Sequence, residues 1–338
     1  MSDETALEEL LSRPTAAVVE AMTSLDGDLM LLGAGGKMGP SLARLARRAI
    51  GQAGVRRKVI AVSRFSEAGL EGALESDGIE TISCDLFDSG RLAQLPDVPN
   101  IVYMAGQKFG TTGEEARTWA VNAYLPGAVA ERFPRSRIVA FSTGNVYPLW
   151  PIGGNGPGES DATGPVGEYA RSALARERVL EFFSRRNRTL MALLRLNYAI
   201  EPRYGVLRDI ADQVRARQPV DLAMGKVNLI WQRDANAVAL MALAHCAVPP
   251  LLLNVTGRPG HEVRWIAMEF GRRFGREPEF TGAEADTALL SDASRCEAMF
   301  GPPETDIGEM IDRVAEWVEQ GGRSLGKPTH FEARDGKF

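Results

Sequence analysis

The chain has 338 residues, enough for about two domains with a buried core. Its 39 basic residues are scattered and are outnumbered by 44 acidic ones, so the formal charge is −5 and nucleic acid is not expected as a partner. The three cysteines and three histidines form no metal-ligand pattern, so we expect no metal site. No apolar run approaches the ~20 residues that span a bilayer, and the acidic N-terminus is unlike a secretory signal. We therefore expect a cytoplasmic protein without a membrane partner.

In chain order, the first predicted elements are two helices over residues 4–11 and 15–24, which form an N-terminal extension of residues 1–25. An apolar run then ends at Gly33, and Gly35, Gly36 and Gly39 follow before a helical pattern over residues 41–50. Gly33 suits the positive φ of a tight turn, Gly36 lets a diphosphate approach the backbone, and Gly39 lets helix and strand pack closely. Strand, glycine turn and helix together predict a dinucleotide site at the helix N-terminus.

Further apolar runs predict five more strands, at residues 58–63, 78–83, 100–104, 137–142 and 190–196. Most of them are continuous apolar runs, which is typical of strands that are buried on both faces. Helical patterns lie between them at residues 114–133 and 167–186. The alternation predicts an α/β fold with a doubly wound parallel sheet.

The end of the second strand bears on the choice of cofactor. It reads Ser63-Arg64-Phe65-Ser66, where a dinucleotide fold that binds NAD usually has a carboxylate for the ribose hydroxyls. Arg64 offers a planar cation to a 2′-phosphate, and Ser63 is a further donor. This favours NADP(H), with NAD(H) as the alternative.

Several later residues follow strands in the order expected around such a cofactor. Asp85 and Leu86 come after the third strand, Met104, Ala105 and Gly106 end the fourth, and Asn122 lies in the next helix. The fifth strand leads into Ser142-Thr143-Gly144-Asn145-Val146-Tyr147, and Tyr169 opens the following helix. With the Gly33-x-x-Gly36-x-x-Gly39 turn, these residues make the chain resemble the extended short-chain dehydrogenase/reductases of the NAD-dependent epimerase/dehydratase family over about residues 28–320.

The resemblance implies a domain order and a site. Residues 26–200 would form the dinucleotide-binding Rossmann domain, 201–320 a smaller α/β substrate lobe with some return to the sheet, and 321–338 a tail. Thr143 would hydrogen-bond the reacting oxygen and Tyr169 would be the acid/base that also contacts the cofactor. Cofactor contacts are further implied for Lys37, Met38 and Asn197, and substrate contacts are predicted for Lys108, Asn145 and Arg203, although an exposed or structural role fits Arg203 as well.

One position departs from the family pattern, which is Tyr-x-x-x-Lys. The fourth residue after Tyr169 is Ala173, so the usual cation beside the phenolate is missing, while Arg176 lies about 10 Å farther along the helix axis. The expected function is an NAD(P)-dependent oxidoreductase or epimerase of a sugar or sugar-acid derivative, with an atypical site. The alternatives are a non-catalytic NADP(H)-binding redox sensor or scaffold, and a lyase or isomerase on the same fold. The resemblance also implies a homodimer.

Overall fold

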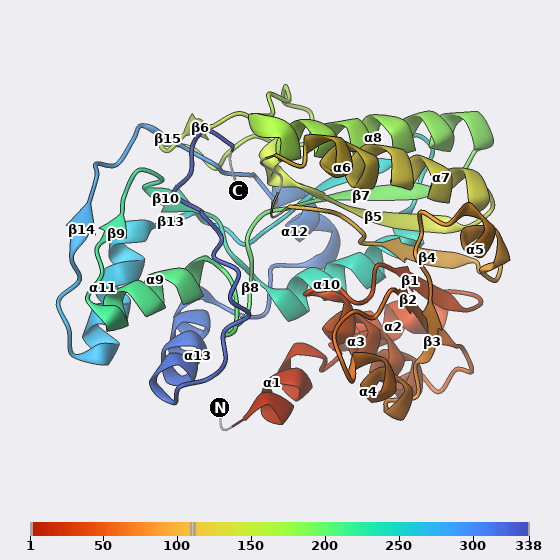
Figure 1. The fold of residues 1–338 in the computed structure, drawn as a ribbon, viewed down its shortest axis with the longest axis horizontal. Coiled ribbons are helices and arrows are strands. Elements are labelled where there is room, and N and C mark those ends of the chain that lie inside the picture. The colour runs from red at the N-terminus through yellow and green to blue at the C-terminus, as the bar shows by residue number, and fades with distance from the viewer. Residues whose placement is uncertain (1–2, 109, 111–112, 337–338) are drawn as a thin grey trace.

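The computed structural model describes residues 3–108, 110 and 113–336, and its centre is a parallel sheet of seven strands (Figure 1). From one edge to the other, the strands are β3 (Glu80–Ser83), β2 (Val59–Ser63), β1 (Leu29–Leu32), β4 (Asn100–Tyr103), β5 (Arg137–Thr143), β7 (Met191–Leu196) and β12 (Leu251–Val255). The order reverses between β1 and β4, so a crevice opens there at the carboxyl ends of the strands. This confirms the predicted doubly wound sheet, to which β12 adds an unpredicted edge strand.

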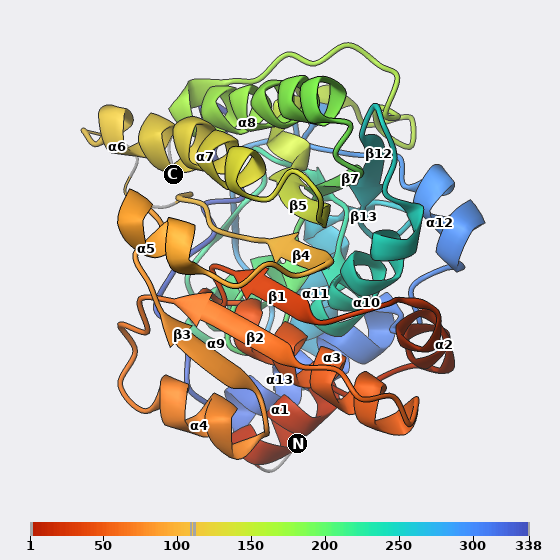
Figure 2. The same ribbon diagram turned by 90° about the vertical axis from the view of Figure 1, so that its right-hand side faces the viewer.

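Helices cover both faces of the sheet (Figure 2). One face carries α5 (Ser89–Gln94), α6 (Glu115–Trp119), α7 (Leu125–Arg132) and α8 (Gly167–Asn187), and the other carries α2 (Ala16–Ser24), α3 (Gly39–Gln52) and α10 (Gln232–Met241). Leu42 and Leu45 of α3 join the core on the second face, whereas Val129 of α7 and Leu180 of α8 join the core on the first. A short helix, α4 (Leu70–Ser76), packs beside β3. No helix among the described residues is long and apolar enough to cross a membrane.

The helix predicted over residues 114–133 is not continuous. A π-helical turn, Ala120–Tyr124, separates α6 from α7. Pro126 has no N–H, so it cannot donate the usual helical bond to the carbonyl of Asn122, and that carbonyl must find another partner. The sequence pattern of apolar residues does not reveal this interruption, which places Asn122 inside the turn.

A second lobe follows β7 and has its own core. It contains α9 (Val206–Ala216), α11 (Val263–Phe274) and α13 (Ile307–Glu319), and the strand pairs β9 (Val220–Asp221) with β14 (Phe280–Thr281), β10 (Lys226–Val227) with β13 (His261–Glu262), and β6 (Trp150–Pro151) with β15 (Thr287–Ala288). The pair β8 (Ala199–Ile200) and β11 (Ile230–Trp231) lies between this lobe and the sheet, and the helix α12 (Ser294–Phe300) packs against the edge strand β12. Leu7 and Leu11 of α1 (Glu4–Leu11) are fully buried in the core of the lobe, although α1 also contacts α3 and α10.

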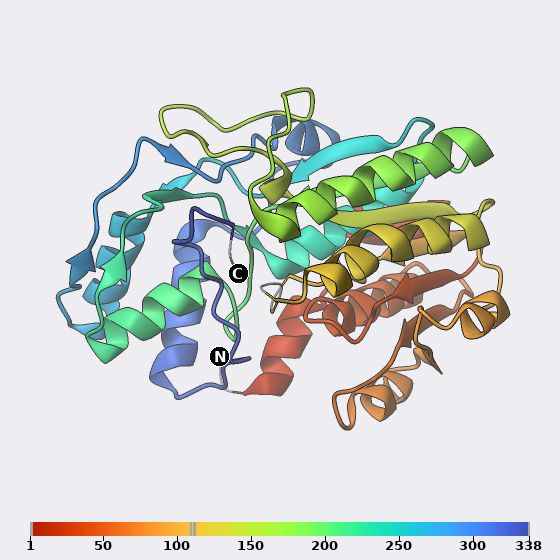
Figure 3. The same ribbon diagram turned by 45° about the horizontal axis from the view of Figure 1, so that its top comes forward.

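The C-terminal segment returns across the molecule between the two lobes (Figure 3). Phe331 is only 2% exposed, and Arg334 donates to the carbonyl and hydroxyl oxygens of Thr287, at 2.7 and 2.6 Å. Gly336 packs against the backbone of Gly167, at the first residue of α8. The predicted polar tail is therefore anchored, up to residue 336, beside the helix that carries Tyr169; residues 337 and 338 lie outside the described part of the chain.

A buried ion pair joins α8 to β7 behind the carboxyl edge of the sheet. Arg195 Nη2 lies 2.7 Å from Glu177 Oε2, and both side chains are only 3% exposed. Glu177 also accepts a hydrogen bond from Ser142, and Arg195 donates to the hydroxyl of Tyr147, each over 2.6 Å. This network holds the segment around Thr143 against α8. Because its charges are shielded from water, removing one partner would leave a buried charge unpaired and would strongly destabilise the fold.

Replacing Glu177 by Met should therefore destabilise the fold by about 3–5 kcal/mol, because Arg195 would keep a buried, uncompensated charge. The double variant Glu177→Met/Arg195→Met should recover much of that loss. Urea unfolding measures both. Glu181→Met is the matched control, since it removes a partly exposed partner of Arg178 and Arg185 at the surface of the same helix and should cost less than about 1 kcal/mol. A Glu177→Met protein as stable as the control would contradict the buried-charge argument.

Candidate active site

The glycine turn after β1 meets the geometric demands that the sequence predicts. Gly33 has φ +93°, and a Cβ there would lie 2.6 Å from the backbone N of Ala105, while a Cβ on Gly39 would overlap the carbonyl group of Ala34. Both positions need glycine for the chain to turn and for α3 to pack on β1. A Cβ on Gly36, by contrast, would meet only the Gly33 carbonyl oxygen, at 3.4 Å. Packing therefore does not require glycine at position 36. The open space in front of its Cα leaves room for a ligand to approach the backbone.

A groove of about 500 Å³ runs from this turn along the carboxyl ends of β1, β2 and β4. Its lining includes most of the predicted cofactor residues: Gly33, Gly36, Ser63, Arg64, Asp85, Leu86, Met104, Ala105 and Gly106. At one end α3 begins at Gly39 without a side-chain cap, but the Gly39 N–H donates to the Gly36 carbonyl at 3.1 Å and Pro40 has no N–H. The positive end of the helix dipole still faces this end of the groove. The groove therefore has the shape for an extended dinucleotide with its diphosphate beside the start of α3.

The end of β2 has no carboxylate facing this groove. Ser63, Arg64 and Ser66 line it, and the exposed Arg64 side chain makes no hydrogen bond or ion pair with the described remainder of the chain. Asp85, at the end of β3, accepts the backbone N–H of Phe87 at 3.0 Å. The guanidinium of Arg64 is thus available to a ligand phosphate.

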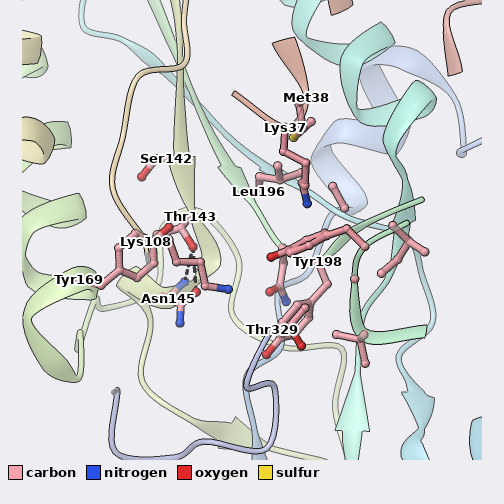
Figure 4. Close-up of a pocket in the computed structure, with 16 residues that line it drawn as sticks. Lys37, Met38, Lys108, Ser142, Thr143, Asn145, Tyr169, Leu196, Tyr198 and Thr329 are labelled. Carbon is pink, nitrogen blue, oxygen red and sulfur yellow. Dashed lines mark hydrogen bonds between the residues drawn. The ribbon is translucent and has the colours of Figure 1, made fainter. Parts of the chain in front are cut away.

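A second, smaller pocket of about 120 Å³ lies at the carboxyl ends of β5 and β7 (Figure 4). It brings together residues that lie far apart in the sequence: Lys37, Lys108, Thr143, Asn145, Tyr169 and Asn197. Thr143 ends β5 and donates to Asn145 Oδ1 at 2.9 Å, while the Asn145 N–H donates back to Thr143 Oγ1 at 3.2 Å. The side chain of Tyr169 hydrogen-bonds that of Thr143, so the hydroxyl groups predicted to act together do meet.

The environment of Tyr169 shifts its acidity in two directions. Burial of the phenol raises its pKa above the usual value, because the phenolate loses its hydration. The hydrogen bond with Thr143 and the positive charge of Arg176 both lower the pKa and so partly offset the effect of burial. Arg176 is thus a cation close enough to Tyr169 to influence its protonation.

Arg176 reaches this place because side chains in a helix tilt toward its N-terminus. Its Nε donates to the Asn122 carbonyl at 3.2 Å, the group that Pro126 deprives of its usual α-helical donor. Its Nη2 donates to Asn122 Oδ1 at 2.7 Å, and its Nη1 donates to the Phe141 carbonyl at 2.7 Å. In the sequence, distance along the helix axis argues against Arg176 as a neighbour of Tyr169, and the signal in its favour is Pro126, four residues after Asn122.

Asn122 itself organises the end of β4. Its side chain is fully buried and makes a pair of 2.9 Å hydrogen bonds with the backbone N–H and carbonyl of Gln107, and it also donates to Ser172 Oγ at 3.0 Å. Since Gly106 and Lys108 flank Gln107, these bonds position both the floor of the groove and one wall of the pocket. Ala173, where the family pattern has lysine, is buried against Val146 and Tyr147.

The structure places the remaining predicted residues as follows. The side chains of Lys37 and Met38 line the smaller pocket and not the groove, and the amide of Asn197 donates to the Leu289 carbonyl at 3.4 Å. Arg203 lies outside this pocket, where it pairs with Glu201 and Glu8. Its predicted contact with substrate therefore has no support in this geometry.

Comparisons with known proteins agree with the fold. Residues 29–250 match the model of the NAD dependent epimerase/dehydratase family. UDP-glucuronic acid 4-epimerase from Bacillus cereus, solved with NAD, superposes with a TM-score of 0.72 at 15% identity over 87% of this chain and 99% of that one. UDP-glucose 4-epimerase from Thermus thermophilus, also solved with NAD, gives 0.70 at 17% identity over 86% of this chain and 99% of that one.

A search of the sequence against curated proteins finds no match. At these identities the solved structures establish the fold alone, while the family model covers well over half of the chain. The chain belongs to the NAD-dependent epimerase/dehydratase family.

Proposed function

We propose that this protein is an NAD(P)-dependent oxidoreductase or epimerase that acts on a sugar or sugar-acid derivative. Family membership supports an enzyme with a nicotinamide cofactor. The observation that carries the proposal is the hydrogen-bonded pair of Thr143 and Tyr169 in the smaller pocket, with the cation Arg176 near it. The bound nicotinamide would supply hydride exchange with a carbinol or carbonyl carbon.

The side chains of this chain would manage the proton that accompanies the hydride. Tyr169 takes the proton from a substrate hydroxyl, or returns it to a carbonyl oxygen. Thr143 orients that oxygen by turning its one hydroxyl hydrogen from Asn145 Oδ1 toward the substrate. Arg176 stabilises the phenolate in place of the absent lysine at position 173, because it is the nearby cation that lowers the Tyr169 pKa. It acts through Tyr169 and is therefore a positioning residue.

Ala173 favours a second candidate, a non-catalytic NADP(H)-binding sensor or scaffold, because the usual partner of the tyrosine is missing. The presence of Arg176 counts against this reading. The third alternative, a lyase or isomerase on the same fold, would need the same Tyr169 to move a proton. A Tyr169→Phe variant therefore separates enzymes from a binding protein.

The pH dependence of turnover tests the role of Arg176. Oxidation needs the phenolate, so below the raised pKa of Tyr169 the rate should climb with pH. Arg176→Met should raise that pKa further and lower the rate at neutral pH by about tenfold for each pKa unit. Ala173→Lys in the Arg176→Met background should move the profile back toward neutral pH, while Tyr169→Phe should nearly abolish turnover without loss of cofactor binding. An unshifted profile in a folded Arg176→Met protein, or full activity in Tyr169→Phe, would contradict the assignment.

We further propose that the cofactor is NADP(H), because Arg64 faces the groove where a 2′-phosphate would lie. A charged hydrogen bond contributes roughly 1.5–3 kcal/mol, so NADP⁺ should bind about ten- to a hundredfold more tightly than NAD⁺. Arg64→Ala should remove this preference in titration calorimetry and leave NAD⁺ affinity unchanged. Gly36→Val is the contrasting variant and should weaken both cofactors. Equal affinities in the unmodified protein would refute the NADP(H) assignment.

We also propose that two copies pair through the helices on one face of the sheet. Tyr124 and Phe182 are 68% and 57% exposed on the neighbouring segments Ala120–Tyr124 and α8, so a second copy would cover apolar surface there. Light scattering at micromolar concentration should show a dimer, and Phe182→Asp should give monomers. Met268→Asp, on the lobe helix α11, is the matched exposed control and should stay dimeric. A monomeric unmodified protein would contradict this arrangement.

A further inference from the structure

Two lysines from distant parts of the chain point into the smaller pocket (Figure 4). Lys37 extends from the glycine turn, and its Nζ lies 3.2 Å from the ring centroid of Tyr204. Lys108 extends from the segment after β4, on the side of Thr143 and Tyr169, with its Nζ 5.9 Å from the ring centroid of Tyr198. The amines thus reach the pocket from two walls, and neither position is needed for the hydride chemistry described above.

The lining of the pocket is positive. Among the described residues that line it there is no Asp or Glu. Gly205 and Val206 also line it, so the N-terminus of the eleven-residue helix α9, which has no side-chain cap, opens onto the same space. The N-terminal end of a helix carries a partial positive charge and free N–H groups.

Charged groups beyond the lining also act on the two lysines, but the acids among them are held by partners of their own. Glu201 and Asp209 are the acids whose charges act on Lys37, and Lys108 and Lys327 are the other cations. Glu201 is fully buried and accepts three hydrogen bonds from Arg203. Asp209, in the first turn of α9, accepts the N–H and hydroxyl of Thr329.

We propose that this pocket recognises the anionic group, a carboxylate or a phosphate, of a compact sugar substrate that carries no nucleotide. The amines of Lys37 and Lys108 and the N-terminus of α9 are the contacts. The inference rests on the proposed function and deepens it, because it names the chemistry of the substrate that Tyr169 and Thr143 would handle.

The acidity of the two lysines is consistent with an anion site. Burial lowers the pKa of Lys37 to about 7 and that of Lys108 to about 8, since each ammonium group has lost hydration. The charge of Glu201 opposes this shift at Lys37 and that of Asp209 opposes it at Lys108, while the charge of Lys108 further lowers the Lys37 pKa. An anion between them would restore the charged forms and form charge-assisted hydrogen bonds with both.

The size of the pocket limits the substrate. Its volume of about 120 Å³ is well below the roughly 300–1,000 Å³ of pockets that hold drug-sized ligands. Tyr198, Tyr204 and Thr329 form part of its wall, and Thr329 belongs to the anchored C-terminal segment. This space suits a free sugar acid or sugar phosphate, whereas a nucleotide sugar would need the wall to move.

Calorimetric titration of the NADP⁺-saturated protein tests the proposal without requiring turnover. The ligands are D-gluconate, D-glucuronate, glucose 6-phosphate, D-glucose and UDP-glucuronate. At least one of the three small anions should bind tenfold or more tightly than D-glucose, and UDP-glucuronate should not bind. Preference for the acids identifies a carboxylate, and preference for glucose 6-phosphate identifies a phosphate.

Lys37→Met and Lys108→Met should each weaken the preferred anion by about tenfold or more and leave NADP⁺ affinity unchanged. Lys58→Met, which removes an exposed lysine paired with Glu80, should change neither affinity. Any of three results would overturn the inference. They are equal affinities for the anion and D-glucose, tight binding of UDP-glucuronate, and a Lys37→Met protein that loses affinity for NADP⁺ but not for the anion. Anion binding that depends on both lysines but never leads to turnover would instead overturn the proposed function and leave this site standing.

Discussion

The carbonyl group of Asn122 cannot make its helical hydrogen bond because Pro126 has no N–H, and much of the candidate site depends on how that group is satisfied. Arg176 donates to this carbonyl and also to the Asn122 amide oxygen and the Phe141 carbonyl. A single buried guanidinium therefore joins α8, the π-helical turn and the end of β5. Because the same charge lowers the Tyr169 pKa, local helix geometry and proton chemistry are linked.

The other cations around the site fall into two groups: arginines paired with buried carboxylates, and lysines that project into the pocket. Arg195 and Arg203 are buried against Glu177 and Glu201, so their charges hold elements together and do not reach a small ligand. Lys37 projects into the pocket, where burial lowers its pKa and the charge of Glu201 only partly offsets that effect. Arginine forms the rigid, multiply bonded contacts, while lysine supplies a point charge on a flexible stem.

The second lobe completes the pocket by long-range contacts. The C-terminal segment brings Thr329 to Asp209 of α9 and packs Gly336 against Gly167 at the start of α8. One segment therefore contacts the second lobe at α9 and the helical layer over the seven-stranded sheet at α8. This arrangement keeps the space beside Tyr169 small.

The sequence alone determined the parts that depend on local rules: six of the seven strands, the glycine turn at Gly33 and Gly39, and Thr143 at the end of a strand. Each follows from periodicity or from backbone geometry within a few residues. Only the tertiary structure decided that the expected helix breaks around Asn122, that Arg176 reaches Tyr169, and which cations pair with carboxylates. Those outcomes depend on groups that folding brings together from distant parts of the chain, and a side chain's neighbours in space cannot be read from its neighbours in sequence.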